Sequence, residues 1–240
     1  MNFVQAKKLS LEYPIKGVNF KFFHNRPFKS NVGGIYHGDS NSQSYINALS
    51  DISFFAPEGE RIGLIGHNGA GKSTLLRLIG GIYPPSSGHL EVKGKVSSIF
   101  ELGTGVDLNL TSYENILRVL MFNGYDYKNS LNLVDKVIEY SEIDEFVYLP
   151  TKALSTGMRL RVMFAIAIHI DFDILCIDEV ITVGDKDFQK KTIETFEHLI
   201  DKSKILFLAS HLIEYQKKFC NTFFYMEKGM LKKVDKLEHI

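Results

Sequence analysis

Several glycines, a lysine and two hydroxyl residues in the first third of the chain have the composition of a phosphate-binding loop. Glycines let the backbone curve tightly enough for successive N–H groups to point at phosphate oxygens, and the N-terminus of a following helix adds positive potential. The lysine of such a loop reaches the β and γ phosphates, and the next hydroxyl binds Mg²⁺. The pattern predicts a nucleoside triphosphate site at Gly66, Asn68, Gly69, Ala70, Gly71, Lys72, Ser73 and Thr74.

The flanks of this motif match the context that it needs. The strand-like residues Ile62–Ile65 precede it, and Lys72–Ile82 has the apolar period of a helix. An ordinary glycine-rich turn between a strand and a helix is the alternative. Taken alone, the motif leaves kinases, GTPases and transport ATPases open.

Two adjacent carboxylates, Asp178 and Glu179, end an apolar strand-like run. Successive strand residues point in opposite directions, so the two carboxylates have different jobs. Asp178 suits the Mg²⁺ held by Ser73, and Glu179 suits the orientation and deprotonation of an attacking water. The alternative is a pair of surface carboxylates, which are common at strand ends.

A second anion site is predicted around Leu154–Met158, just before a helical run. Ser155 supplies a hydroxyl, Gly157 allows close approach, and the helix N-terminus adds positive potential. The alternative is a simple helix cap by Ser155 or Thr156.

Leu154–Met158 resembles the signature motif of ABC ATPases, whose commonest form is Leu-Ser-Gly-Gly-Gln. Three further residues match the family pattern in order, and their roles follow from the resemblance. His211 is similar to the switch histidine that contacts the γ phosphate, and Asp185 to the aspartate that communicates across the dimer. Tyr13 is similar to the aromatic residue that stacks on adenine, with simple packing as its alternative. The resemblance runs from about Phe3 to Lys232.

One departure from the family pattern points to a branch. Glu101 stands where most members have a glutamine, and it can offer an oxygen to Mg²⁺ but cannot donate a hydrogen bond. The stretches around it, 101–105 and 110–116, are similar to the branch that exports polysaccharide of the O-antigen, capsule or teichoic acid type. The run from Asp178 to Lys191 is similar to that branch too.

The resemblance implies an ATPase that binds ATP and Mg²⁺ and works as a homodimer with two transmembrane permease subunits. Its cargo would be a lipid-linked polysaccharide, and it would lie peripherally on the cytoplasmic face of the inner membrane. Three alternatives remain: a soluble ABC ATPase acting on nucleic acid or ribosomes, a non-hydrolysing regulatory module, and an ABC subunit for import or another cargo.

Composition supports a cytoplasmic protein without a nucleic-acid partner. The 28 basic and 28 acidic residues cancel, so there is no bulk positive field to attract nucleic acid. The longest apolar run, Val162–Ile170, is far shorter than the ~20 residues of a membrane-spanning helix and predicts a buried core helix. Of the two cysteines, Cys176 lies in an apolar strand pattern, which favours packing over a disulfide.

The elements that must position these residues alternate between strand and helix, which predicts an α/β fold with a mostly parallel sheet. We expect one domain over 1–240, a P-loop NTPase with an ABC-type core. Its parts would be an antiparallel β subdomain and core start over 1–100, a helical subdomain over 101–153, and the signature helix with the rest of the core over 154–240. Within the first part, 14–45 is predicted to be an irregular insertion. The expected strands are Phe3–Tyr13, Ile46–Phe55, Arg61–Ile65, Asp173–Ile177 and Lys204–Ala209; the expected helices are Lys72–Ile82, one from Thr111, Leu131–Tyr140, one from Gly157 and Phe188–Ile200; a hairpin is expected over Phe223–Lys232. Thr111 and Glu114 have the spacing of a capping box at the start of the second helix.

Overall fold

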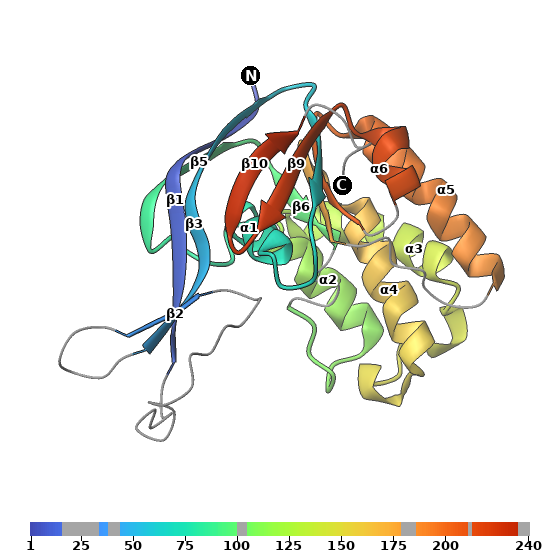
Figure 1. Cartoon of the computed structure of the whole chain (residues 1–240). Coiled ribbons are helices and arrows are strands. Elements are labelled where there is room, and N and C mark those ends of the chain that lie inside the picture. Colours follow the sequence, from blue (N-terminus) through green and yellow to red (C-terminus); the bar gives the residue numbers. More distant parts are fainter. Residues whose placement is uncertain (16–33, 38–43, 100–104, 179–185, 211–212, 235–240) are drawn as a thin grey trace. The chain divides into compact units, whose positions relative to one another are not determined.

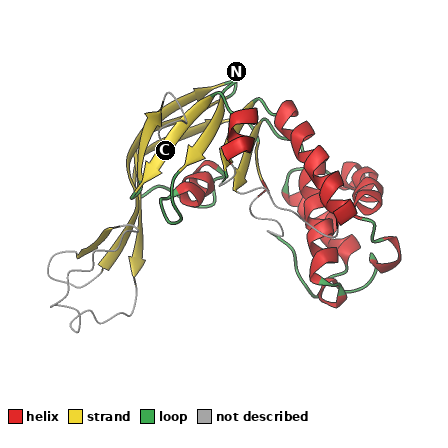
Figure 2. Ribbon diagram, turned by 45° about the vertical axis from the view of Figure 1, so that its right-hand side comes forward, coloured by secondary structure: helices red, strands yellow, loops and turns green. Residues whose placement is uncertain are grey.

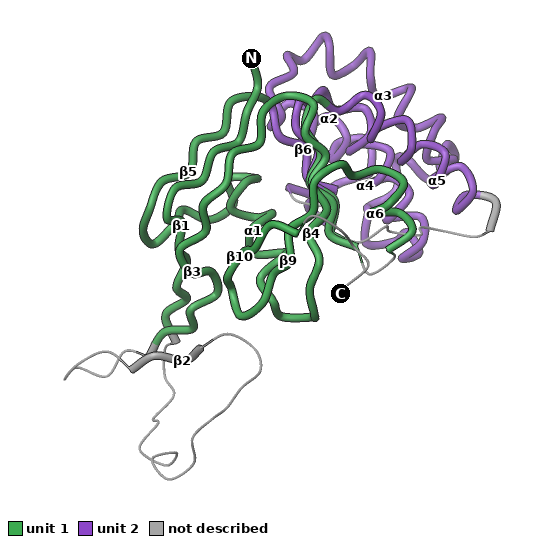
Figure 3. Tube along the Cα trace, turned by 45° about the horizontal axis from the view of Figure 1, so that its top comes forward, with its two compact units in different colours: residues 1–94, 177–179, 204–240 green, residues 95–176, 180–203 purple. Residues whose placement is uncertain are grey.

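The computed structural model describes residues 1–15, 34–37, 44–99, 105–178, 186–210 and 213–234. They belong to two compact units (Figure 3). Unit 1 comprises Met1–Gly94, Ile177–Glu179 and Lys204–Ile240, and unit 2 comprises Lys95–Cys176 and Val180–Ser203. The domain boundaries drawn from the sequence stay a prediction.

Unit 1 contains an antiparallel sheet with the strand order β2-β3-β1-β5 (Figure 1). Its strands are β1 (Phe3–Ile15), β2 (Gly34–His37), β3 (Ser44–Pro57) and β5 (Ser87–Lys93). Along β1 the buried residues are Val4 and Ala6, then Leu9 and Leu11, so the alternation slips by one position. The slip coincides with a register shift and with Lys8 at φ 48°, which is how a β-bulge keeps the apolar side chains on one face.

The expectation of an irregular segment over 14–45 is wrong where the structure describes it. β1 continues to Ile15, β3 begins at Ser44, and β2 pairs with β3 in the register Gly34↔Asn47 to His37↔Ser44. The run Ile35–Tyr36 has strand-forming residue types, but it is too short between its flanking glycines to show a period. Residues 16–33 and 38–43 lie outside the described part of the chain.

Unit 1 also holds the strand and helix that flank the phosphate loop. β4 (Arg61–Ile65) lies between β8 (Ile205–Ala209) and β9 (Thr222–Glu227) and is parallel to both, and β10 (Met230–Val234) pairs antiparallel with β9. β4 and β8 are almost wholly buried, as is usual for strands covered on both faces. The predicted hairpin near the C-terminus is thus confirmed. The helices of this unit are α1 (Lys72–Ile79) and α6 (Ile213–Phe219).

Unit 2 is mainly helical. Figure 2 draws the helices of the chain as red ribbons. Its helices are α2 (Ser112–Phe122), α3 (Tyr127–Ser141), α4 (Thr156–His169) and α5 (Lys186–Lys202), with 3-10 turns at Asp144–Phe146 and Thr151–Ala153. β6 (Val96–Ser98) pairs in parallel with β7 (Ile174–Asp178), whose last residues belong to unit 1. None of the helices in the described ranges has the length and apolarity needed to cross a membrane.

The apolar run Val162–Ile170 lies largely in α4 and packs in the core of unit 2, as predicted. Val162, Ala165 and Ile166 of this run join side chains from α2, from α3 and from the segment between α3 and α4 in one cluster: Ile116, Val119, Leu120, Val134, Val137, Ile143, Val147, Leu154, Val162, Ala165 and Ile166. Cys176 in β7 is fully buried, and burial raises the pKa of its thiol, which agrees with packing rather than reactivity.

The capping box predicted at the start of α2 is present. The backbone N–H of Glu114 donates to Thr111 Oγ1 at 3.1 Å, and the backbone N–H of Thr111 donates to Glu114 Oε2 at 2.8 Å. The bond from the Thr111 backbone is the main reason why the pKa of the Glu114 carboxyl lies below its ordinary value. The ionised carboxylate therefore fixes where the helix begins.

Replacing the cap tests this reading. Thr111→Ala should lower the free energy of unfolding in urea by about 1 kcal/mol, and Thr111→Ser, which keeps the hydroxyl, should lower it much less. Because the pKa of Glu114 is lowered on folding, its contribution is complete above the ordinary carboxyl pKa and is lost as the pH falls through the lowered value. Equal stability of the two variants would show that the box does not stabilise α2.

Candidate nucleotide site

The phosphate loop connects β4 to α1 through a backbone path that excludes side chains at two glycines. Gly66 has φ 148°, and a Cβ there would collide with the carbonyl oxygen of Met226. Gly71 caps α1 with φ 109°, and a Cβ there would lie 2.9 Å from Leu49 Cδ2. A loop curved in this way turns its N–H groups inward, which is the geometry that binds phosphate oxygens.

The C-terminal hairpin is hydrogen-bonded to the phosphate loop and to β3. The N–H of Gly229 donates to the carbonyl of Ala70 at 3.0 Å, and the N–H of Ser50 in β3 donates to the carbonyl of Gly229 at 2.8 Å. Lys228 and Gly229 both have positive φ, as in a two-residue hairpin turn of type I′. The sequence predicted this hairpin but not its contact with the loop, because a turn signal is local and its tertiary partner is not.

Lys72 points its ammonium group at the loop. Its Nζ donates to the carbonyl oxygen of Gly66 at 2.6 Å and to that of His67 at 3.0 Å, and the residue is only 8% exposed. A buried charge needs such partners. Ser73 and Thr74 follow in the first turn of α1, where helix N–H groups have no partner within the helix. The loop and the helix start thus combine a positive charge, two hydroxyl residues and backbone N–H donors, and this donor set fits a phosphate chain with Mg²⁺.

Tyr13 lies beside this helix. Its ring contacts Tyr83 edge-on, with centroids 5.6 Å apart. Burial is the main cause that raises the pKa of Tyr13, and a hydrogen bond with Thr74 acts in the opposite direction. The structure therefore brings Tyr13 next to α1, which packing alone would also explain. Its stacking on adenine stays a prediction.

Of the two adjacent carboxylates, the structure describes the first. Asp178 is half-buried at the end of β7, after four buried apolar residues, and belongs to the same unit as the phosphate loop. Four of the predicted site residues lie outside the described part of the chain: Glu101, Glu179, Asp185 and His211.

Gln216 is a buried residue of unit 1 that sequence reasoning missed. Its side-chain amide donates to the carbonyl of Leu64 in β4 at 3.0 Å and to that of Ser210 at 2.8 Å. Its Oε1 has no partner within the described residues. Gln216 therefore ties the strand that enters the phosphate loop to the residue before His211. The short helix α6 that carries it shows no apolar period in the sequence, so nothing local pointed to it.

The predicted signature segment begins α4 in unit 2. Ser155 is the N-cap, and its Oγ accepts from the N–H of Met158 at 3.1 Å. Ser155 and Thr156 are exposed. A Cβ at Gly157 would meet only Ser155 Oγ, at 3.9 Å, so the space over the helix start is open. A helix cap and an exposed anion site are both compatible with this geometry.

A buried strand, a glycine loop without room for side chains, a buried lysine and a helix N-terminus define a P-loop nucleotide-binding domain. The predicted α/β class with a mostly parallel sheet is confirmed by the parallel pairs β4–β8, β4–β9 and β6–β7. Solved structures of similar fold support the same class.

The family model described as "ABC transporter" matches residues 49–182. The chain belongs to the ABC transporter family. It is 39% identical, over 94% of each chain, to "O-antigen export system ATP-binding protein RfbE" of Yersinia enterocolitica. It is also 39% identical, over 83% of this chain and 75% of the relative, to "Teichoic acids export ATP-binding protein TagH" of Staphylococcus haemolyticus.

The fold is that of solved ATP-binding cassettes. A dimeric post-hydrolysis structure of the ATP-binding cassette MJ0796, bound to ADP and Pi, superposes with a TM-score of 0.69 at 20% identity and covers 99% of this chain. The resemblance to ABC ATPases and to their polysaccharide-export branch, predicted from the sequence, is confirmed by these matches. The alternative of a soluble ATPase acting on nucleic acid finds no support in them.

A pair of glycine substitutions tests the loop geometry. Gly66→Ala should abolish ATP binding, measured by titration of a fluorescent ATP analogue, because its Cβ meets the Met226 carbonyl. Gly81 also has a positive φ, 73°, but a Cβ at that position would meet nothing within 4 Å, so Gly81→Ala is the control. It should cost about 1–3 kcal/mol of stability and leave binding intact. Normal ATP binding by a folded Gly66→Ala chain would contradict the loop geometry.

Proposed function

We propose that this chain is the ATP-binding and ATP-hydrolysing subunit of an ABC transporter that exports a lipid-linked polysaccharide across the cytoplasmic membrane. The observation that carries the proposal is the phosphate loop, with its crowded glycines and buried Lys72, in a chain similar to RfbE over nearly its whole length. The loop supports the chemistry, and the similarity supports the class of cargo.

In this proposal the loop residues bind the triphosphate, and Lys72 moves from the loop carbonyls to the β and γ phosphates. Ser73 and Asp178 would hold Mg²⁺, with Glu101 as a further oxygen donor, and Thr74 would contact the α phosphate. Mg²⁺ offsets the negative charge of the phosphates when it is bound. Tyr13, beside Thr74, would stack on the adenine.

Hydrolysis requires a water in line with the bond between the γ phosphorus and the bridging oxygen. Glu179 would orient this water and take its proton as the new P–O bond forms, and the electrons of the broken bond would leave on ADP. His211 would contact the γ phosphate and help to hold it in place. This assigns a base and a positioning group to the ends of two consecutive strands of the chain, β7 and β8.

The second half of each site would come from another copy. Ser155 is exposed and Gly157 is partly exposed at the start of α4, where a helix N-terminus attracts negative charge. We infer that two chains close head to tail around two ATP molecules, each loop facing the Ser155–Gly157 tip of its partner, with Asp185 communicating across the interface. ATP would bind the closed dimer more tightly than the open form, and hydrolysis would let it reopen.

Two membrane-spanning permease subunits would convert this closure into transport, with the chain lying peripherally at the cytoplasmic face. Large apolar side chains that are exposed together, rather than singly, mark interaction surfaces. On unit 2 they include Met121, Phe122 and Tyr148, which are 47%, 69% and 70% exposed. These residues support a docking surface for the permease on the helical part of unit 2.

Gly157→Ala separates the stability of α4 from the function of its tip. Alanine favours the helix and has room there, so the free energy of unfolding should be equal or higher by up to about 1 kcal/mol. ATP binding to the isolated chain, through a loop in the other unit, should not change. The steady-state ATPase rate of the transporter complex should fall about 10²-fold, because the added methyl group misplaces the partner's nucleotide. Full activity would show that Gly157 does not face a nucleotide.

Glu179→Gln tests the catalytic base. The amide cannot accept the proton, so the ATPase rate should fall at least ~100-fold while ATP binding is retained. A closed dimer should accumulate with Mg·ATP and be visible by size-exclusion chromatography. Normal steady-state turnover in this variant would refute the assignment of Glu179.

A further inference from the structure

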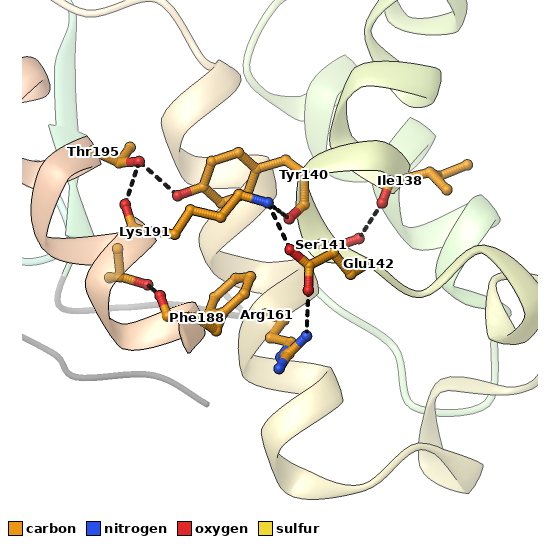
Figure 4. A network of polar contacts seen from close by, with 9 residues as sticks. Ile138, Tyr140, Ser141, Glu142, Arg161, Phe188, Lys191 and Thr195 are labelled. Carbon is orange, nitrogen blue, oxygen red and sulfur yellow. Dashed lines mark hydrogen bonds and ion pairs between the residues drawn. The ribbon is translucent and has the colours of Figure 1, made fainter. Parts of the chain in front are cut away.

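A single carboxylate links three helices of unit 2, as Figure 4 shows. Glu142, at the end of α3, receives a hydrogen bond from Arg161 of α4 at 3.0 Å on Oε2, and one from Lys191 of α5 at 2.9 Å on Oε1. Each carboxylate oxygen therefore binds a different helix.

Both cations also contact aromatic rings, which restricts their positions. Arg161 lies over the ring of Phe188 at 4.4 Å, and Lys191 lies over the ring of Tyr140 at 4.4 Å. Lys191 further donates to the carbonyl of Tyr140 at 2.9 Å. A cation held by a ring face, a carbonyl and a carboxylate has one preferred geometry. The network therefore specifies how α4 and α5 are placed.

The backbone at Glu142 is unusual for a residue of its type. Glu142 is the C-cap of α3 with φ 57° and ψ 44°, a left-handed conformation that favours glycine or asparagine. Neither of those residues has a carboxylate. A local preference is thus violated at the residue whose side chain bridges two other helices, and such violations are expected where a side chain has a further function.

Stability alone is a weak explanation for the network. The side chains of Glu142 and Lys191 are 51% and 36% exposed, and an ion pair exposed to this degree contributes little to folding. Arg161 is 16% exposed, but it pairs with the same half-exposed carboxylate. Unit 2 already has an extensive apolar core between α2, α3 and α4. The hydrogen bond from Lys191 lowers the pKa of the Glu142 carboxyl, so the carboxylate is charged at neutral pH and available to both cations.

Both linked helices adjoin residues that contact nucleotide in the proposed mechanism. Arg161 lies six residues after the N-cap Ser155, which is about 9 Å along the axis of α4. α5 begins at Lys186, directly after the stretch of chain that contains Glu179 and Asp185. A change in the angle between these helices would move the Ser155–Gly157 tip relative to the chain segment that leads to the base.

We propose that Glu142 is a positioning residue: its carboxylate fixes α4 against α5 and thereby sets the position of the Ser155–Gly157 tip that engages nucleotide on a second copy. This inference rests on the proposed function of the tip. It predicts that loss of the carboxylate weakens closure of the dimer without weakening ATP binding to one chain.

Glu142→Gly is the informative variant because it relieves the left-handed backbone while it removes the carboxylate. In the full chain carrying Glu179→Gln, the ATP-driven dimerisation constant should weaken about tenfold, a size typical of coupling between sites. The affinity of the monomer for a fluorescent ATP analogue should stay within about twofold, and Tm within about 4 °C, since strain relief offsets the lost pairs. Glu139→Gln removes an exposed carboxylate from the same helix and should leave all three values at those of the parent.

A double-mutant cycle keeps the proposal falsifiable if Glu142→Gly folds poorly. Glu142→Gln and Lys191→Gln should each weaken dimerisation, and together they should weaken it by less than the product of the single effects. Unchanged dimerisation in the Glu142 variants, or strictly multiplicative effects in the cycle, would overturn the role of Glu142 but not the proposed function. Failure of the Glu179→Gln parent to dimerise with ATP would overturn the proposed function and this inference with it.

Discussion

The close approach of Gly66 to the Met226 carbonyl is the contact on which the nucleotide site depends. It leaves no room for a Cβ at position 66, so the loop can follow its path there only with glycine. The hydrogen bond from Gly229 to Ala70 fixes the other end of the same loop. The C-terminal hairpin is therefore part of the site, although the phosphate-binding residues are far from it in sequence.

The ammonium of Lys72 depends on this curvature in turn. Its Nζ bonds two carbonyls from the start of the loop, so a buried charge is stabilised where phosphate oxygens would later offset it. The tip at Ser155–Gly157 has the complementary character. The Ser155 hydroxyl caps its own helix, Ser155 and Thr156 are exposed, and the space above Gly157 is open. The phosphate loop and this tip belong to different compact units, and the proposed dimer is what gives the tip a nucleotide to bind.

The parts of the fold that the sequence predicted are those whose signals are local. The strand and helix around the phosphate loop, the capping box of Thr111 and Glu114, and the buried helix at Val162–Ile170 each show their own period or end signal. β2 and α6 were missed because each is too short to show a period. Gln216 and Gly229 were missed for another reason: they act through hydrogen bonds to distant segments, and no local pattern encodes such partners. The ion pairs of Glu142 were missed for the same reason, because the two cations come from two other helices.

The central claim is that ATP is held between the phosphate loop of one chain and the Ser155–Gly157 tip of another. It is tested most directly by determining the structure of the Glu179→Gln chain with Mg·ATP. The account predicts two ATP molecules at the interface of two chains, each contacted by residues 66–74 of one chain and by the tip of its partner. A structure in which each triphosphate is enclosed by a single chain, with no contact from a second copy, would contradict it.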